Sequence, residues 1–313
     1  MEGINCLASL VSRNPDGLEV LVNRFGYGDI IERRLAEGRD CLQAEFHSHT
    51  IQSCVIDDLL PEDHAARIFA AFPDKSEMNV KKNLRFYKYF AAQMDKYNPL
   101  LEEIVFAFQQ PGVLQAVKEI TGIRDLEPDE HLYVGGISLM AKDNFLNPHL
   151  DNSHDRNRQA YRVLNLLYYV SPGWAHECGG NLELWDEGPK GEPREIVSRF
   201  NRLVMMATHE KSWHSVNQVN VDRNRCCVSN FYFSAKPLED HDYFHVTSFR
   251  GRPEQPVRDL VLQGDIVLRQ GIRKVFKKGI VENPHMYKKT EDQHSENVPL
   301  HSAEVEGGDS SRE

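Results

Sequence analysis

Residues 162–185 have the sequence RVLNLLYYVSPGWAHECGGNLELW. The segment 162–170 is rich in Val, Leu and Tyr, which favour β-strands. Pro172-Gly173 and the pair Gly179-Gly180 that follow are typical of turns. A second short run, residues 181–185, alternates polar with apolar side chains. The stretch therefore predicts two strands joined by a turn segment rich in glycine and proline.

The same texture extends to both sides, because short runs rich in Val, Leu, Tyr and Phe alternate with clusters of Gly, Pro, Asn and Asp from residue 131 onward. The strands that we expect are 131–140, 162–170, 181–185, 194–198, 202–207, 214–219 and 226–233. Short strands at this spacing predict a β-sandwich or a barrel.

The residues before 131 favour helices. Pro61 suits the first turn of a helix, and Ala65, Ile68, Phe69 and Phe72 then recur at helical spacing. Further helical segments are expected at 99–108, 113–120 and, in part, 258–281. Helices followed by a series of short strands predict an α+β fold with a mainly β core.

Composition excludes several classes of protein. The chain has 313 residues, of which 40% are hydrophobic and 27% charged, so it can bury a sizeable core. Its net charge of −10 disfavours a general nucleic-acid or membrane-surface binder. We find neither a run long enough for a membrane helix nor a secretory signal in the first 20 residues, and we expect a cytoplasmic protein.

The six cysteines favour a reducing compartment. They stand at positions 6, 41, 54, 178, 226 and 227, and the adjacent pair Cys226-Cys227 is poorly placed for a disulfide. None is spaced like a zinc site. Buried or idle thiols are the simplest interpretation.

Two C-terminal segments have unusual charge. Residues 267–289 carry a local excess of Lys and Arg, which indicates either a solvated helix face or a site for an anionic substrate or partner. The segment 290–313 is polar and acidic, and we expect it to be disordered.

Pro148-His149-Leu150-Asp151 carries the strongest chemical signal. Residues i and i+2 of a strand point to the same face, so His149 and Asp151 can occupy adjacent corners of one coordination sphere. Two His and one carboxylate form the facial triad that holds Fe(II) with open positions. We choose His214 as the third ligand because it lies in a strand-like segment. His209 is the rival, in a segment that resembles a loop.

Arg225 follows His214 at the start of an apolar strand, where a guanidinium can bind a carboxylate in a bidentate manner. The ordered set of His149-x-Asp151, Gly179-Gly180-x-Leu-x-Leu, His214-x-Val216 and Arg225 resembles the Fe(II)/2-oxoglutarate-dependent oxygenases, in their prolyl-4-hydroxylase-like branch. The resemblance covers about residues 131–234, and the stretch 51–72 resembles the family's lead-in strand and helix.

The resemblance implies a double-stranded β-helix, or jelly roll, with the metal near one open end. His149, Asp151 and His214 would bind Fe(II), and Arg225 would pair with the distal carboxylate of 2-oxoglutarate. Dioxygen is the second cosubstrate, with succinate and carbon dioxide as co-products. Because halogenating relatives lack the carboxylate ligand, Asp151 argues against halogenation, but it does not separate hydroxylation from desaturation, cyclisation or epimerisation.

Other contacts follow from the resemblance less directly. Asn165 is either a cosubstrate contact or a satisfied core amide, and Cys227, on the strand face of Arg225, is a candidate for lining the cosubstrate pocket. The tyrosine that many prolyl hydroxylases carry before the HxD motif is missing from Leu139–Asn147. The cosubstrate contacts therefore differ from theirs.

The polar loop after Asp151 supplies candidate substrate contacts, with a solvated loop as the alternative. We select Asn152, His154 and Arg156 from it, and add Trp213 beside the distal histidine, although packing is the commoner role of such a Trp. The pairs His47/His49 and His241/His245 lack convergent partners and are not expected to bind metal.

These observations predict an enzyme with four regions. Residues 1–130 form a helical lead-in packed on the core, 131–236 the catalytic core, 237–289 a C-terminal extension and 290–313 the tail. We expect a dioxygenase that hydroxylates a small-molecule metabolite. A prolyl-type protein hydroxylase is the alternative, and a non-catalytic metal-binding or partner-docking module is the alternative from another class.

Overall fold

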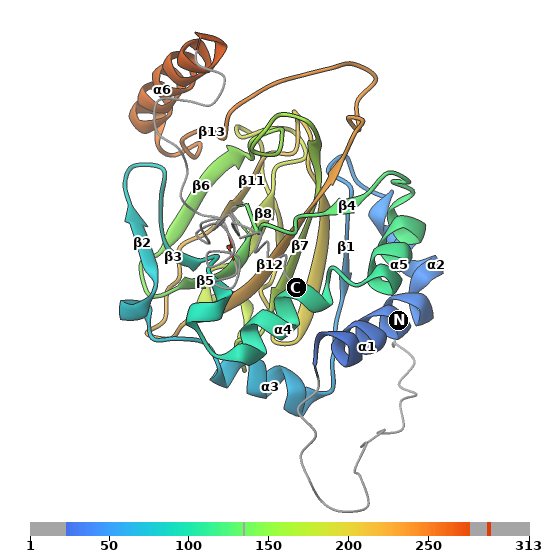
Figure 1. The fold of residues 1–313 in the computed structure, drawn as a ribbon. Helices are drawn as coiled ribbons and strands as arrows, with labels where there is room; N and C mark the ends of the chain where they lie inside the picture. The colour runs from blue at the N-terminus through green and yellow to red at the C-terminus, as the bar shows by residue number, and fades with distance from the viewer. Residues whose placement is uncertain (1–22, 134, 276–286, 289–313) are drawn as a thin grey trace, which may run out of the picture.

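The structure is a computed structural model, and it describes residues 23–133, 135–275 and 287–288. The expected tail at 290–313 lies outside the described residues, as do Cys6 and most of the basic stretch beyond 275. Helices lie mainly on one side of a strongly curled antiparallel sheet (Figure 1). This arrangement confirms the predicted α+β class and its jelly-roll core.

The helices of the first half are amphipathic segments that cover the sheet. The predicted helices after Pro61, at 99–108 and at 113–120 are confirmed as α3, α4 and α5, whereas α1 and α2 were not specified in advance. The helices are α1 (Arg24–Glu37), α2 (Arg39–Phe46), α3 (Glu62–Ala70), α4 (Pro99–Ala107), α5 (Pro111–Thr121) and α6 (Pro256–Val275). Prolines begin α4, α5 and α6, where a missing N–H costs nothing.

The described residues form one sheet of 13 strands. The strands are β1 (Ser53–Ile56), β2 (Asn79–Lys82), β3 (Phe86–Ala91), β4 (Glu127–Pro128), β5 (Gly136–Met140), β6 (Phe145–Leu150), β7 (Tyr161–Tyr169), β8 (Leu182–Leu184), β9 (Arg194–Ile196), β10 (Arg202–Ala207), β11 (His214–Val216), β12 (Arg225–Ser234) and β13 (Ser248–Phe249). Neighbouring strands follow the order β1-β10-β7-β12-β5-β3-β6-β11-β8-β9.

The expected strands are present with shifted ends, whereas β2, β3, β4, β6 and β13 were not among them. The expected strand 131–140 begins only at Gly136, because Leu132 and Gly136 have positive φ angles of 45° and 101° and form a turn. The expected strand 214–219 ends at Val216. The hairpin of β2 and β3 was not anticipated, and β3 lies between β5 and β6, which are consecutive in the chain.

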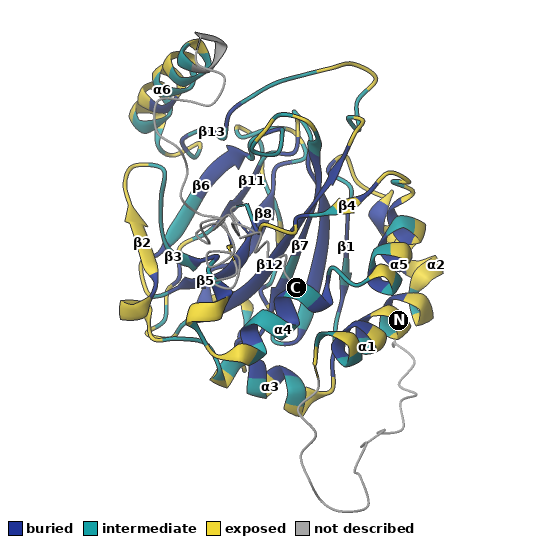
Figure 2. Ribbon diagram, viewed as in Figure 1, coloured by how far each residue is buried: buried dark blue, intermediate teal, exposed yellow. Residues whose placement is uncertain are grey.

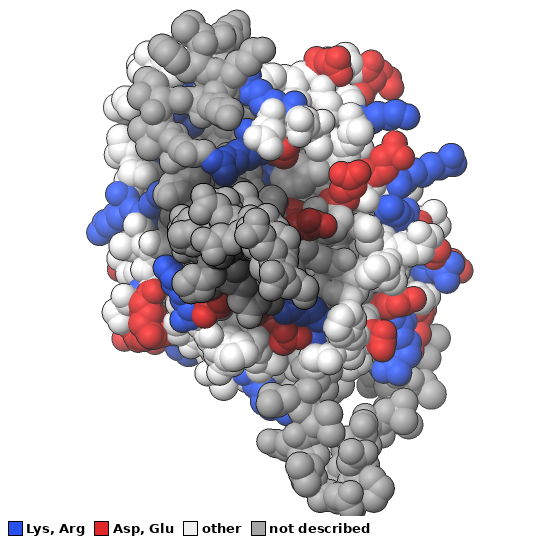
Figure 3. All heavy atoms as spheres, in the orientation of Figure 1, with Lys and Arg blue, Asp and Glu red and all other residues white. Residues whose placement is uncertain are grey.

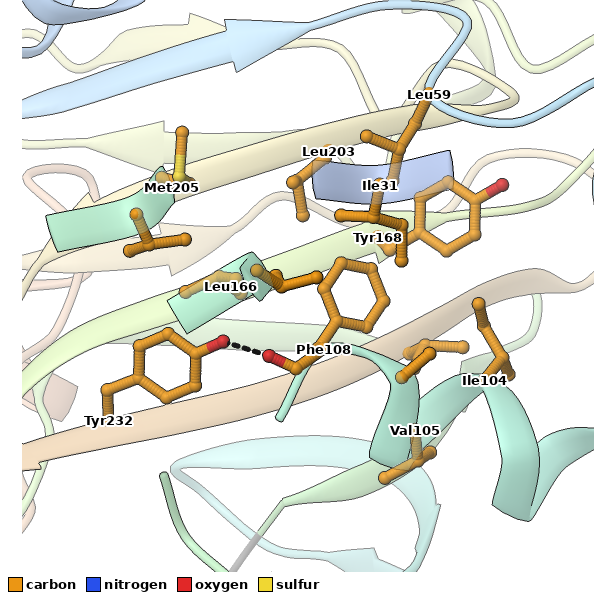
Figure 4. Close-up of a cluster of buried hydrophobic side chains, with 14 of the residues drawn as sticks. Ile31, Leu59, Ile104, Val105, Phe108, Leu166, Tyr168, Leu203, Met205 and Tyr232 are labelled. Carbon is orange, nitrogen blue, oxygen red and sulfur yellow. Dashed lines mark hydrogen bonds between the residues drawn. The ribbon is translucent and has the colours of Figure 1, made fainter. Parts of the chain in front are cut away.

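The hydrophobic core lies between the helices and the outer face of β7, β10 and β12. Alternate residues of these strands, such as Leu166, Tyr168 and Tyr232, pack against α1 and α4 (Figure 4). The Tyr232 hydroxyl donates to the Phe108 carbonyl at the end of α4. Figure 2 shows the central strands buried and β2 exposed at the edge. The helices therefore fix the sheet from outside and leave its inner face for other contacts.

The inner face of the curled sheet encloses a cavity of about 710 Å³. Its walls include Asn165 from β7, Arg225 and Cys227 from β12, and His214 from β11. The two halves of the sheet meet across it, since Asn165 in β7 donates to Asp151 at the end of β6. Among the described residues, no helix has both the length and the apolar character needed to cross a membrane.

Candidate active site

The three predicted metal ligands converge at the cavity. One ligand atom from each of His149, Asp151 and His214 lies within 4.8 Å of the other two, and this is the one such cluster of three or more found among the described residues. The Asp151 carboxylate lies 3.7 Å from His149 Nε2 and 3.6 Å from His214 Nε2. His149 and His214 stand opposite each other in the register of β6 and β11.

A bulge in β6 places these ligands. The register slips between His214 and Val216, which pair with His149 and Leu146, so β6 contains one extra residue there. Pro148 lies in this bulge, where a residue without an N–H is tolerated. The chain leaves the strand after Leu150, and Asp151 turns back toward both histidines.

Backbone carbonyls orient both imidazoles. Nδ1 of His149 lies 3.0 Å from the Asn147 carbonyl, and Nδ1 of His214 lies 2.9 Å from the Ser212 carbonyl. Both contacts favour protonation at Nδ1 and leave Nε2 free to bind a metal. Phe249 stacks on His149 with ring centroids 5.0 Å apart. The rings are thus held before any metal binds.

Burial and nearby charges set the ionisation of this cluster. Desolvation, with the neighbouring His214, lowers the pKa of His149 to about 3, so its imidazole is neutral near pH 7. Burial alone would raise the pKa of Asp151, but Arg162 and the two histidines outweigh burial and hold that pKa below its usual range. Neutral imidazoles and an ionised carboxylate are the forms that bind divalent metals.

Two side chains of β7 hold Asp151 in place. The Asn165 amide donates to Asp151 Oδ2 over 2.8 Å, and Arg162 Nη1 lies 3.6 Å from the same oxygen. Arg162 is 1% exposed and stacks on Phe231, 4.1 Å from the ring centroid. Asn165, predicted as a cosubstrate contact, contacts the predicted metal ligand, while its Oδ1 has no hydrogen-bond partner among the described residues.

Arg225 is buried in the same cavity. Its Nε donates to Ser198 Oγ over 2.9 Å, its Nη1 lies 3.5 Å from Met140 Sδ, and the guanidinium stacks on Tyr169. No described carboxylate forms an ion pair with it. The Tyr169 hydroxyl is also buried without a hydrogen-bond partner among the described residues. A carboxylate ligand would satisfy both groups.

The glycine turn brings Ser198 and Arg225 together. Gly180 has φ +68°, and a Cβ built on it would lie 2.9 Å from Arg225 Cδ. Its carbonyl accepts from Ser198 Oγ, the group that holds Arg225. The Gly179-Gly180 motif is therefore required by a positive φ and by close approach to the arginine.

The remaining predicted residues are divided between the cavity and other places. Cys227, Asn152 and His154 line the cavity, whereas Arg156 and Trp213 do not. Trp213 lines a second cavity of about 420 Å³. The rival ligand His209 pairs with Glu239 at 3.1 Å.

Sequence reasoning missed Arg162 and Lys88, which both line the cavity. Strict alternation along β7 places Arg162 on the opposite face to Asn165. A bulge at Val163, visible as a register shift against β12, turns Arg162 inward. Lys88 lies on β3, in the hairpin that we did not anticipate. The sequence signal that could have indicated Arg162 is an arginine at the start of an otherwise apolar strand.

The sequence profile of the 2OG-Fe(II) oxygenase superfamily matches residues 135–233, the segment that contains the three candidate metal ligands and Arg225. Residues 135–233 belong to this superfamily. Fe(II) and 2-oxoglutarate are accordingly the metal and cosubstrate of this core. The described residues fit both groups, since the ligand cluster and the unpaired Arg225 open into one cavity.

Curated relatives and solved structures are similar to parts of the chain. Prolyl 3-hydroxylase OGFOD1 from Mus musculus is 29% identical over 168 residues, which cover 48% of this chain and 29% of the relative. The chain thus spans under a third of that relative's length. A Pseudomonas putida prolyl-4-hydroxylase has a TM-score of 0.47 at 18% identity, and the match covers 63% of this chain and 98% of the other. Prolyl 4-hydroxylases from Phytophthora capsici have a TM-score of 0.48 at 18% identity. The match covers 78% of this chain and 75% of the other.

Proposed function

We propose that the chain is an Fe(II)- and 2-oxoglutarate-dependent dioxygenase that hydroxylates a C–H bond of a small-molecule metabolite, with succinate and carbon dioxide as co-products. The observation that carries the proposal is that Asp151 and His214, which form a cluster with His149, line the same cavity as Arg225. Its volume of about 710 Å³ lies within the range typical of small-molecule sites.

In this proposal each cavity residue has a defined task. His149, Asp151 and His214 hold the iron, which with 2-oxoglutarate activates dioxygen and supplies the oxidising power. Arg225 and Tyr169 bind the distal carboxylate of 2-oxoglutarate, and Ser198 fixes the guanidinium. Asn165 and Arg162 keep Asp151 ionised and oriented. Cys227 lines the cosubstrate side of the cavity. The curled sheet limits the access of water.

A protein substrate is the second candidate. The similarity to the mouse prolyl 3-hydroxylase OGFOD1 favours a prolyl-type protein hydroxylase, since that relative's name assigns it prolyl hydroxylation. For either substrate we propose a cytoplasmic enzyme, because all five described cysteines are free.

Anaerobic titration of Fe(II) and 2-oxoglutarate into the purified protein tests the proposal. Bidentate chelation produces a weak visible metal-to-ligand charge-transfer band, which we expect in the wild type and in His209→Ala but not in His214→Ala. A folded, iron-loaded protein without the band would instead favour a non-catalytic metal-binding or partner-docking module.

A second experiment separates the two substrate classes. Succinate release is measured with a panel of small metabolites and, in parallel, with proline-containing peptides. Release that depends on a metabolite supports our proposal. Release that depends only on the peptides supports the protein hydroxylase.

A further inference from the structure

Four residues form a row along the cavity wall on four neighbouring strands. Lys81 in β2 pairs with Lys88 in β3, and Met140 in β5 pairs with Arg225 in β12. Because Tyr89 pairs with Leu139, the register of β3 and β5 sets Lys88 beside Met140. Residues opposite each other in antiparallel strands share a face, and all four line the main cavity. The row therefore carries three cationic side chains from the edge strand to Arg225.

The two lysines of this row have no counter-ion among the described residues. Lys88 forms no hydrogen bond or ion pair with them, and Lys81 contacts the Phe90 ring, 5.4 Å from its centroid. Like charges directly opposite each other in a sheet are destabilising. Burial lowers the pKa of Lys88, an effect that the Asp151 carboxylate opposes, whereas Lys81 is exposed at the edge of the sheet. An anion between the two amino groups would relieve both costs.

Several other cavity arginines already have partners. Arg85 and Arg269 both pair with Asp265, and Arg162 lies close to Asp151. Arg158 lies over the Phe244 ring, 3.9 Å from its centroid, and Arg225 is the cation that the proposed function assigns to the distal carboxylate of 2-oxoglutarate. Lys81 and Lys88 are thus left without an anion when the cosubstrate is bound.

The charge of the cavity differs from that of the whole chain. The described lining residues include seven Lys or Arg against two Asp, whereas the chain has a net charge of −10. Acidic and basic side chains are interspersed over the face drawn in Figure 3. A cavity with this excess of positive charge attracts and concentrates anions.

We propose that Lys81 and Lys88 form a binding site for an oxyanion of the substrate, a phosphate or a carboxylate group. This inference rests on the proposed function and narrows its substrate to an anionic metabolite. Two flexible ammonium groups act as point charges with three donors each, which suits a phosphate or carboxylate approached from two strands. Lys88 lies on the metal side of the pair, so an anion held there keeps the rest of the substrate near the metal.

Calorimetry with inorganic phosphate and with acetate tests this site. The protein is first loaded anaerobically with Fe(II) and 2-oxoglutarate, so that Arg225 and the metal are occupied. We expect the wild type to bind at least one of the two anions. The double variant Lys81→Met/Lys88→Met should raise the dissociation constant of that anion at least tenfold. Lys88→Arg, which keeps the charge, should retain most of the affinity.

Lys82→Met is the matched control. Lys82 is the next residue of β2, lies over the Tyr87 ring at 4.7 Å and does not line the cavity. Lys82→Met removes one positive charge from β2, as Lys81→Met does, but outside the cavity. Anion binding should therefore be unchanged. If the wild type binds neither anion, or if the double variant binds as tightly as Lys82→Met, the inference is wrong.

Two readouts separate this inference from the proposed function. The charge-transfer band is recorded first. Its absence refutes the proposed function, whether or not the protein binds phosphate. The affinity for 2-oxoglutarate is then compared, and we expect it to change less than threefold in the double variant. A tenfold loss of 2-oxoglutarate affinity would show that the lysines hold the cosubstrate and would overturn the substrate assignment.

A measurement on the wild-type protein covers the case in which the double variant fails to fold. The ³¹P resonance of phosphate should be broadened by the protein loaded with paramagnetic Fe(II) and 2-oxoglutarate, and much less by the protein loaded with diamagnetic Zn(II). Equal linewidths in the two samples would place phosphate away from the metal and would contradict the proposed site.

Discussion

At the scale of single residues, Arg225 is the side chain whose surroundings are best suited to a bound carboxylate. It is 4% exposed, it is held by Ser198, and no described carboxylate neutralises it. We expect Arg225→Ala to weaken 2-oxoglutarate binding at least a hundredfold, because a buried charge-assisted bidentate contact is lost. Calorimetry measures this affinity in the Mn(II)-loaded protein. Metal affinity should stay nearly unchanged, and an equal loss of both would sink the assignment.

Asn165 is the residue whose predicted and observed contacts differ most. Its amide donates to Asp151, so we expect Asn165→Leu to weaken metal binding by ten- to a hundredfold, as is common for groups that orient a metal ligand. The metal dissociation constant, measured by competition with a chelator, reports this effect. If only 2-oxoglutarate affinity fell, Asn165 would be the cosubstrate contact that the sequence suggested.

The candidate ligands that the sequence expects together, and that lie together in the structure, include two that are close in the chain. His149 and Asp151 are two positions apart, so local chain geometry brings them together, and His149 stands opposite His214 in the register of β6 and β11. Lys88 and Arg162 could not be found in this way. Lys88 depends on β3 entering the sheet between two consecutive strands, and Arg162 depends on a bulge that reverses the alternation of β7.

At the scale of elements, the glycine turn before β8 supports the arginine. Gly180→Ala is unfavourable for two reasons. Residue 180 has a positive φ of 68°, and a Cβ there would lie 2.9 Å from Arg225 Cδ. Gly188 has a similar φ of 82°, and a Cβ built on it would have no atom within 4 Å. We therefore expect Gly188→Ala to cost about 1–2 kcal/mol of stability with unchanged 2-oxoglutarate affinity. Gly180→Ala should cost more and weaken that affinity, and calorimetry compares the two variants.

An ion pair attaches β8 to the segment after β13. Arg252 contacts both oxygens of Glu183, which is 3% exposed, over 3.0 and 2.6 Å. We expect Arg252→Ala to lower the free energy of unfolding by about 3–5 kcal/mol, because it leaves a buried carboxylate unpaired. Urea denaturation measures the change. Arg199→Ala, which breaks the more exposed pair with Asp57, should cost no more than about 1 kcal/mol.

The hairpin of β2 and β3 shows why the sheet could only partly be predicted. Strands were recognised where an apolar face packs under the helices, as in β7 and β12. β3 directs Lys88 into the cavity, so the apolar alternation that marks a strand is interrupted. A strand whose inner face serves a ligand lacks the pattern by which strands are found.

At the scale of the whole molecule, one buried acid links stability to pH. Burial raises the pKa of Asp129 to about 6, against an ordinary value near 3.8, and its Oδ2 has no hydrogen-bond partner among the described residues. The folded state therefore holds this proton more tightly than the unfolded state. The stability that the folded state gains from binding this proton is fully present below pH 3.8 and is lost as pH rises through about 6.

Asp129→Asn should remove that loss. We expect the wild type to lose about 3 kcal/mol more of its unfolding free energy than the variant between pH 4 and pH 7. Urea denaturation at intervals of one pH unit gives both curves. Parallel curves would show that the pKa of Asp129 is the same in the folded and the unfolded protein.

The hydrogen bond between Asn165 and Asp151 joins two halves of the sheet that are distant in strand order. A metal bound at Asp151 would thereby restrain β7 as well as β6 and β11. Amide hydrogen exchange should then slow on metal addition along the middle of β7, although that strand supplies no ligand. In Asn165→Leu the same protection should stop at β6 and β11, so that one side-chain amide decides how far the metal's stabilising effect extends through the protein.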